Sequence, residues 1–253
     1  MTIRFACLVL LLAFAPSLEG QDEEKIKKLF EDAIAAMGGQ AYLDVKDMVT
    51  DGNYFLFDRD GNSSGLIKYN DWTKLPNKSR NELGNKKKLK DVTVFNLDRN
   101  EGWILEGQKE TRDATPEEMK SFRNAVKHAL DNIMRTRWKD PANKLFYLGP
   151  GEGRDLQLDQ VQLLDPENDT VTIFFHRIKR LPAKIEYKDV SARGVQVRHV
   201  EEYDQWHTIQ GIYTPMRIDH FANGRKASQL FVNTITYNTS IPDATFTKPI
   251  PPK

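Results

Sequence analysis

The stretch GLIKYNDWTKLPNKSRNEL, residues 65–83, indicates the fold class of this chain. It contains two β-type runs, 65–72 and 78–83, separated by the turn sequence KLPN. Proline and asparagine are typical of chain reversals, so we expect the two runs to pair as neighbouring strands. A connection this short leaves no room for a crossover helix, so the pairing is predicted to be antiparallel.

The same pattern continues on both sides of this hairpin. Further β-type runs, separated by turn clusters such as DRDGN and DRNEG, cover residues 48–57, 89–97, 102–107, 156–164, 170–178, 183–190, 195–203, 212–221 and 229–238. The runs YFLF (54–57) and VTIFF (171–175) are apolar on both faces, so these strands need cover on both sides. A curved sheet with helices inside its concave face meets that need, whereas a small closed barrel fills its lumen with strand side chains.

Two helices are predicted to supply this cover. Apolar residues three and four positions apart predict an amphipathic helix over 22–37, which ends at the glycine pair 38–39. Thr115 and Pro116, followed by two glutamates, are typical of the start of a second, longer helix. Its apolar positions are Met119, Phe122, Val126, Leu130, Ile133, Met134 and Trp138. We therefore expect a mainly antiparallel β fold with helices (α+β): an incomplete, curved β-barrel whose concave face is covered by an N-terminal helix and a central helix.

Residues 1–20 have the pattern of a secretory signal peptide. The basic start MTIR, the apolar run FACLVLLLAFA and the exit SLEG follow one another, and the run is too short for a membrane span. We expect cleavage near Gly20. The only cysteine, Cys7, lies inside this segment, so residues 21–253 contain none. Disulfides, thiol catalysis and cysteine-ligated zinc are thereby excluded from the exported chain.

The charge balance excludes one class of partner. With 37 basic and 36 acidic side chains the formal net charge is +1, which argues against a nucleic-acid binder. The strongest local feature is the run Lys86-Lys87-Lys88. It is interpreted as a solvated hairpin tip; contact with anionic lipid head groups is the alternative.

The sequence shows no recognisable catalytic or metal motif. The five histidines are dispersed, without the i, i+4 spacing of a helical zinc site, and GxxxxGK[ST] and GxGxxG are absent. GNSSG (61–65) has the letters of GxSxG, but it continues the turn cluster DRDGN between two β-type runs and does not open the helix that a nucleophile elbow requires. We therefore expect no catalytic residue, no metal and no cofactor. A hydrolase with an unrecognised site around His199, Glu201 and His207 is the least supported alternative.

Five segments, taken in order, carry a resemblance to a known family: AMGG (36–39), GLIKYNDWTKLPNKSRNEL (65–83), EGWILEG (101–107), GIYTPMRI (211–218) and VNTITYNTSIPDATFTKP (232–249). They resemble the LolA-type outer-membrane lipoprotein carriers and their bacterial superfamily. The resemblance implies a single half-barrel domain over 21–253, a periplasmic location and an apolar cavity for acyl chains. One position departs from the family: Leu75 stands where an arginine commonly helps to hold the lid.

The first functional interpretation is an exported, non-enzymatic carrier or receptor for lipid or lipoprotein acyl chains. Strand parity and helix face predict that its cavity is lined by Phe55, Phe57, Trp103, Phe122, Val126, Leu130 and Met134. The alternative is a periplasmic lipid-sensing regulatory module that acts through a protein partner. The expected partners are acyl chains, with transient contact to envelope membrane proteins or anionic head groups, and no nucleic acid.

Overall fold

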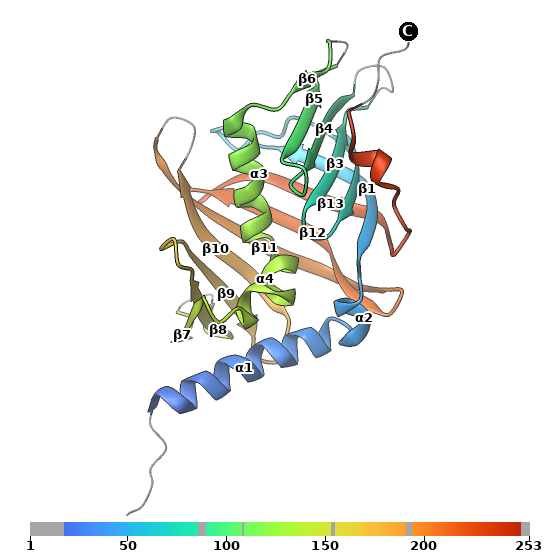
Figure 1. Cartoon of the computed structure of the whole chain (residues 1–253). Helices are drawn as coiled ribbons and strands as arrows, with labels where there is room; N and C mark the ends of the chain where they lie inside the picture. The colour runs from blue at the N-terminus through green and yellow to red at the C-terminus, as the bar shows by residue number, and fades with distance from the viewer. Residues whose placement is uncertain (1–17, 86–89, 108, 153–154, 191–193, 249–253) are drawn as a thin grey trace, which may run out of the picture.

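A computed structural model gives the structure of this protein (Figure 1). It describes residues 18–85, 90–107, 109–152, 155–190 and 194–248, with side chains from residue 21 onward. The segment 1–17 of the predicted signal peptide, with Cys7, lies outside the described residues. So do Lys86-Lys87-Lys88 and Leu89, the expected first residue of a strand.

Within these residues, thirteen strands form one sheet in which every neighbouring pair is antiparallel. The strand order is β6-β5-β4-β3-β2-β1-β13-β12-β11-β10-β9-β8-β7. The bounds are β1 Asp47–Leu56, β2 Ile67–Lys74, β3 Lys78–Leu83, β4 Asp91–Asn96, β5 Glu101–Leu105, β6 Arg112–Asp113, β7 Lys144–Pro150, β8 Leu158–Leu164, β9 Thr170–His176, β10 Pro182–Val190, β11 Gln196–Ile209, β12 Ile212–Ala222 and β13 Arg225–Tyr237. The end strands β6 and β7 do not pair with each other, so the predicted incomplete barrel is confirmed.

The centre of the sheet is the pairing of β1 with β13, which runs from Met48 opposite Tyr237 to Leu56 opposite Ser228. The buried carboxylate of Asp47, at the start of β1, also binds the segment that follows β13. It accepts hydrogen bonds from the backbone N–H groups of Thr239 at 2.6 Å and Ile241 at 3.3 Å. The first and last described strands therefore hold the two meanders together.

The α-helices and η2 lie on the concave side and at one end of the sheet, whereas η4 packs against β3 and β4 from the convex side (Figure 1). Their bounds are α1 Leu18–Ala36, α2 Gln40–Leu43, α3 Pro116–His128, α4 Leu130–Arg135, and the 3-10 helices η2 Arg137–Lys139 and η4 Asp243–Phe246. Helix α1 buries Phe30, whose ring stacks on Trp138 at 4.8 Å and meets Phe175 edge-on at 5.0 Å. The main core thus joins α1 and the end of α4 to strands β7–β10.

The glycine pair after α1 connects two of the segments that carry the family resemblance. Gly38 has φ of +123°, a region that favours glycine. A Cβ there would lie 2.7 Å from the carbonyl oxygen of Gly211, in the β11–β12 turn. The backbone N–H of Tyr213 also donates to the carbonyl of Met37 at 2.9 Å. The end of α1 is therefore tied to the sheet at AMGG and GIYT.

The expected single helix over 115–138 is divided in two. Its start is as predicted, because Thr115 and Glu118 form a reciprocal capping box. At Ala129, however, ψ is 131°, which interrupts the helix between α3 and α4. The amide of Asn132 satisfies a freed carbonyl by donating to Val126 at 3.1 Å. The break lets Ile133 and Met134 enter the main core, while α3 crosses the concave face.

Ion pairs attach the end of α3 to the β8–β9 turn. Lys127 lies 2.5 Å from a carboxylate oxygen of Asp165 and 3.3 Å from Asp169, and His128 lies 2.8 Å from Asp169. Burial raises the pKa of Asp165, but hydrogen bonds from Lys127 and from backbone N–H groups outweigh it. The net effect is a pKa below the ordinary value of 3.8. The charged form of Asp165 therefore favours the folded state.

We predict that Gly52→Ala destabilises the protein. A Cβ at Gly52 would overlap the carbonyl oxygen of Phe231 and lie 2.7 Å from the ring of Tyr69, so backbone and ring must both shift. The expected loss is about 1–3 kcal/mol, as for other overpacked cores, measured by urea unfolding. Gly224→Asn is the control, because its positive φ tolerates asparagine and no atom lies within 4 Å. Equal stability of the two variants would contradict the prediction.

We also predict that stability falls at acid pH, in part through Asp165. Because the folded-state pKa lies below 3.8, the stabilisation is complete above 3.8 and is lost as the pH falls through the folded-state value. Asp165→Asn keeps an oxygen that can accept from the backbone and removes the titration. The free energy of unfolding should therefore change less between pH 6 and pH 3 in this variant. Identical pH profiles of the two proteins would be inconsistent with this role.

Candidate functional site

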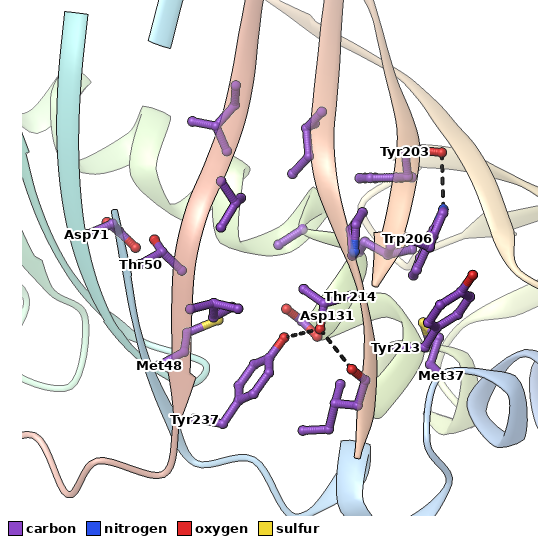
Figure 2. Close-up of a pocket in the computed structure, with 18 of the residues that line it drawn as sticks. Met37, Met48, Thr50, Asp71, Asp131, Tyr203, Trp206, Tyr213, Thr214 and Tyr237 are labelled. Atoms are coloured by element: carbon purple, nitrogen blue, oxygen red, sulfur yellow. Dashed lines mark hydrogen bonds between the residues drawn. The ribbon is translucent and has the colours of Figure 1, made fainter. Parts of the chain in front are cut away.

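A central cavity of about 340 Å³ lies between the concave face of the sheet and the helices α2, α3 and α4. Strands β1, β2, β11, β12 and β13 line one side, and the other is lined by Ala125, Ala129 and Leu130. Figure 2 shows Met48, Trp206 and Tyr237 projecting into it from different strands. Its other apolar or aromatic lining residues include Met37, Tyr203, Tyr213, Ile218, Leu230, Val232 and Ile235.

Several polar groups of the central cavity pair with one another or favour their neutral forms, and Asp131 forms an ion pair of 3.3 Å with Arg135. The hydroxyls of Thr214 and Tyr237 share a hydrogen bond of 2.7 Å (Figure 2). Burial, and then the charge of Asp131, raises the pKa of Tyr237 to about 12. Burial also raises the pKa of Asp71, against a hydrogen bond of 2.7 Å from Thr73. The interior therefore suits an apolar ligand.

A second space, here called the basic compartment, adjoins the central cavity beside β2 and β3. Its volume is about 660 Å³, and it shares Met48, Ala125, Ala129 and Asp131 with the central cavity. Its cationic lining residues are Lys46, Lys78, Arg135 and Lys139. Leu75, the position at which the chain departs from the family pattern, also lines this compartment. An apolar side chain therefore stands where the resemblance implied a latching arginine.

A third space, the polar compartment, adjoins the central cavity below α3. Its volume is about 420 Å³, and it shares Ala125, Glu201, Ile218 and Leu230 with the central cavity. Its other lining residues are Tyr54, Ser121, Asn124, His128, Tyr187, Asp189, His199, His220 and Ser228. The rings of His128, Tyr187, His199 and His220 stack in that order, with successive centroids 4.1, 5.0 and 5.2 Å apart.

Three of the seven residues predicted to contact a ligand line these spaces. Phe122 and Val126 line the basic compartment, and Leu130 lines the central cavity. All three come from the face of the central helices that the apolar spacing indicated. Their contact with a ligand stays a proposal.

The other four predicted residues lie elsewhere. On β1, Met48, Thr50 and Tyr54 face the cavities, so Phe55 and Phe57 have the opposite parity and point to the convex face. There Phe55 meets Phe231 edge-on at 6.0 Å. Met134 is fully buried in the main core. Trp103 belongs to a second buried cluster with Ile241 and Phe246, which follow β13 and cover β4 and β5.

Sequence reasoning missed most of the cavity lining. Trp206, Tyr213 and Tyr237 were not selected, although Tyr213 belongs to a segment that carries the family resemblance. Of the polar compartment, only His199 and Glu201 were named, as part of the hydrolase alternative. The signal for a shared face was present in the alternation of His199, Glu201 and Tyr203 on β11, because residues two apart share a face. The alternation does not reveal that β12 pairs with β11 and places His220 beside these residues.

The residues of the hydrolase alternative do not converge. His199 and Glu201 line the polar compartment, whereas His207 is exposed and lines none of the three spaces. At about 3.3 Å per residue, His207 lies roughly 20 Å from Glu201 along β11. Within the described ranges, no three His, Cys, Asp or Glu side chains are grouped to hold a metal ion. No helix in the described part of the chain is long and apolar enough to cross a membrane.

Comparison with known proteins gives matches of structure rather than of sequence. No protein-family model matches the chain, and no curated protein matches it by sequence. A LolA superfamily protein from Nitrosomonas europaea matches with a TM-score of 0.56 and 14% identity, over 88% of this chain and 97% of that chain.

Two further solved structures match over a similar extent. A DUF1329 family protein from Desulfovibrio piger has a TM-score of 0.58 and 11% identity, over 88% of this chain and 97% of its own. A domain described as an outer membrane lipoprotein-sorting protein, from Vibrio parahaemolyticus, has a TM-score of 0.53 and 11% identity, over 87% and 96%. At such identities the likeness concerns the fold alone. The chain has the LolA-like fold that its sequence predicted: an open, curved antiparallel sheet with helices over its concave face.

Proposed function

We propose that this protein is an exported, non-enzymatic carrier or receptor that binds the acyl chain of a lipid or lipoprotein. The observation that carries the proposal is the apolar central cavity between the sheet and α3–α4. The LolA-like fold supports it, because one of the matching structures is described as a lipoprotein-sorting domain. The predicted signal peptide supports a periplasmic location.

The energetics of an acyl chain require an enclosing site. Each methylene removed from water contributes about 0.8 kcal/mol, so a chain of some fifteen methylenes loses roughly 12 kcal/mol on release into solution. A flat surface cannot compensate for that loss, whereas a cavity that surrounds the chain can. The central cavity and the basic compartment, of about 340 and 660 Å³, fall in the range of small-molecule sites.

Ala125 is the position at which this proposal is most directly tested. It lines all three spaces, and its small side chain leaves room between them. We expect Ala125→Trp to lower the affinity for a fluorescent fatty acid at least about tenfold, because the indole would occupy the volume that the chain needs. Displacement titration measures the affinity, and native mass spectrometry of protein taken from the cell envelope should show a lipid-sized adduct that the variant lacks.

Lys120→Trp is the matched control. Lys120 lies on the exposed face of α3 and lines none of the three spaces, so the same side chain is added outside the cavities. This variant should bind like the wild type, and both variants should keep the thermal midpoint within a few degrees. Equal binding by all three proteins would contradict an acyl-chain site under α3.

A second prediction separates the carrier from a hydrolase. Because His207 lies far along β11 from Glu201, we expect no turnover of ester, glycoside or peptide substrates above background. We expect His207→Ala to leave lipid binding unchanged. Turnover that His207→Ala abolishes would overturn the non-enzymatic proposal, whatever the binding result.

A further inference from the structure

The polar compartment is lined by hydrogen-bonding side chains, whereas the adjoining central cavity is mainly apolar. Strand register places Tyr187 opposite His199, Glu201 opposite His220, and His220 opposite Ser228. Polar side chains therefore cross the concave face of four adjacent strands. The central cavity begins directly beside them, at residues that both spaces share. A molecule that extends through both spaces meets an apolar region and then a hydrogen-bonding region.

His128 contributes a buried hydrogen-bonding group without a protein partner. Its side chain is 4% exposed, and Nε2 lies 2.8 Å from a carboxylate oxygen of Asp169. A carboxylate only accepts, so Nε2 carries a hydrogen. Among the described residues, Nδ1 has no hydrogen-bond partner. A buried polar nitrogen without a partner is unfavourable, and a ligand hydroxyl, which both donates and accepts, would relieve it.

His199 and His220 form a hydrogen-bonded pair that cannot carry a positive charge on both rings. Nδ1 of His199 lies 3.0 Å from Nε2 of His220, so one ring accepts from the other and at least one is neutral. Burial lowers the pKa of both rings below the ordinary value of 6.5, which favours their neutral forms at neutral pH. Each ring keeps its second nitrogen for another partner.

The compartment offers neither lysine nor arginine to an anionic group, among the described residues that line it. The acidic residues that line it are Asp189 on β10 and Glu201 on β11, and burial raises the pKa of Glu201. The other titratable groups facing this space are Tyr54, His128, Tyr187 and the histidine pair. A phosphate or carboxylate would therefore lose its hydration without gaining a charge partner.

We propose that the polar compartment holds the uncharged, hydroxyl-bearing head group of an acylated ligand, such as a monoacylglycerol, whose chain lies in the adjoining central cavity. This inference rests on the proposed function and narrows its ligand class. Hydroxyls both donate and accept, so they match imidazole nitrogens, Tyr187 and Ser228 together. The lysines of the basic compartment lie in a different space, which lets head-group chemistry distinguish the two ends.

Three ligands with one oleoyl chain test the proposal: monoolein, methyl oleate and oleoyl lysophosphatidylglycerol. The purified protein is titrated with each at pH 7.5 by displacement of a fluorescent fatty acid. Two further hydrogen bonds should make monoolein bind about tenfold more tightly than methyl oleate. The anionic lipid should also bind more weakly than monoolein.

The double variant Tyr187→Phe/Ser228→Ala removes two hydroxyls and keeps the ring stack. It should reduce the preference for monoolein and leave the affinity for methyl oleate unchanged, since the imidazole nitrogens remain. Tyr147→Phe, which removes a hydroxyl that donates to Asp159 outside the three spaces, is the control and should keep the preference. Equal binding of monoolein and methyl oleate, tightest binding of the anionic lipid, or an unchanged preference in the double variant would overturn the inference and leave the acyl-chain site intact. Failure of all three ligands to bind would overturn the proposed function as well.

Discussion

The pairing of β1 with β13 is the interaction on which the rest of the structure depends. It brings together the first and last strands at the centre of the sheet, and each meander extends outward from it to an unpaired end. Because β6 and β7 do not meet, the curved sheet has a concave face that its own strands cannot enclose. Helices must cover that face, and the cavities are the space that helix side chains leave unfilled.

The antiparallel pairing of consecutive strands and most strand bounds could be predicted because turn residues and short spacing are local signals, whereas the pairing of β1 with β13 has no local signal. KLPN between β2 and β3 is one example of a local signal. The helix break at Ala129 could not be, since neither glycine nor proline stands there and the cause is burial of Ile133 and Met134 in a distant core. The longer extent of β11, to Ile209, likewise follows from its pairing with β12 rather than from its own alternation.

The candidate site was less predictable than the fold, because a doubly apolar strand does not reveal which face meets the cavity. In YFLF it is Tyr54 that faces the cavities, and the two phenylalanines point to the convex face. Trp103 was misassigned for a related reason: Ile241 and Phe246, far along the chain, cover it from the convex side. Dispersed histidines gave no motif in sequence, yet strand register pairs His199 with the strand of Tyr187 and brings His220 beside it, and the end of α3 adds His128 to the same stack.

The break at Ala129 separates two helices that are held very differently. Helix α4 buries Ile133 and Met134 completely in the main core, whereas α3 buries only Met119 and His128, near its two ends. Segments with few buried contacts open locally at lower free energy than the whole domain unfolds. Local opening of α3 therefore costs less free energy than unfolding of the domain, and the ion pairs of Lys127 and His128 with the β8–β9 turn oppose it at one end of the helix. Under the proposed function, entry and exit of an acyl chain would follow this local opening and would be decoupled from global stability.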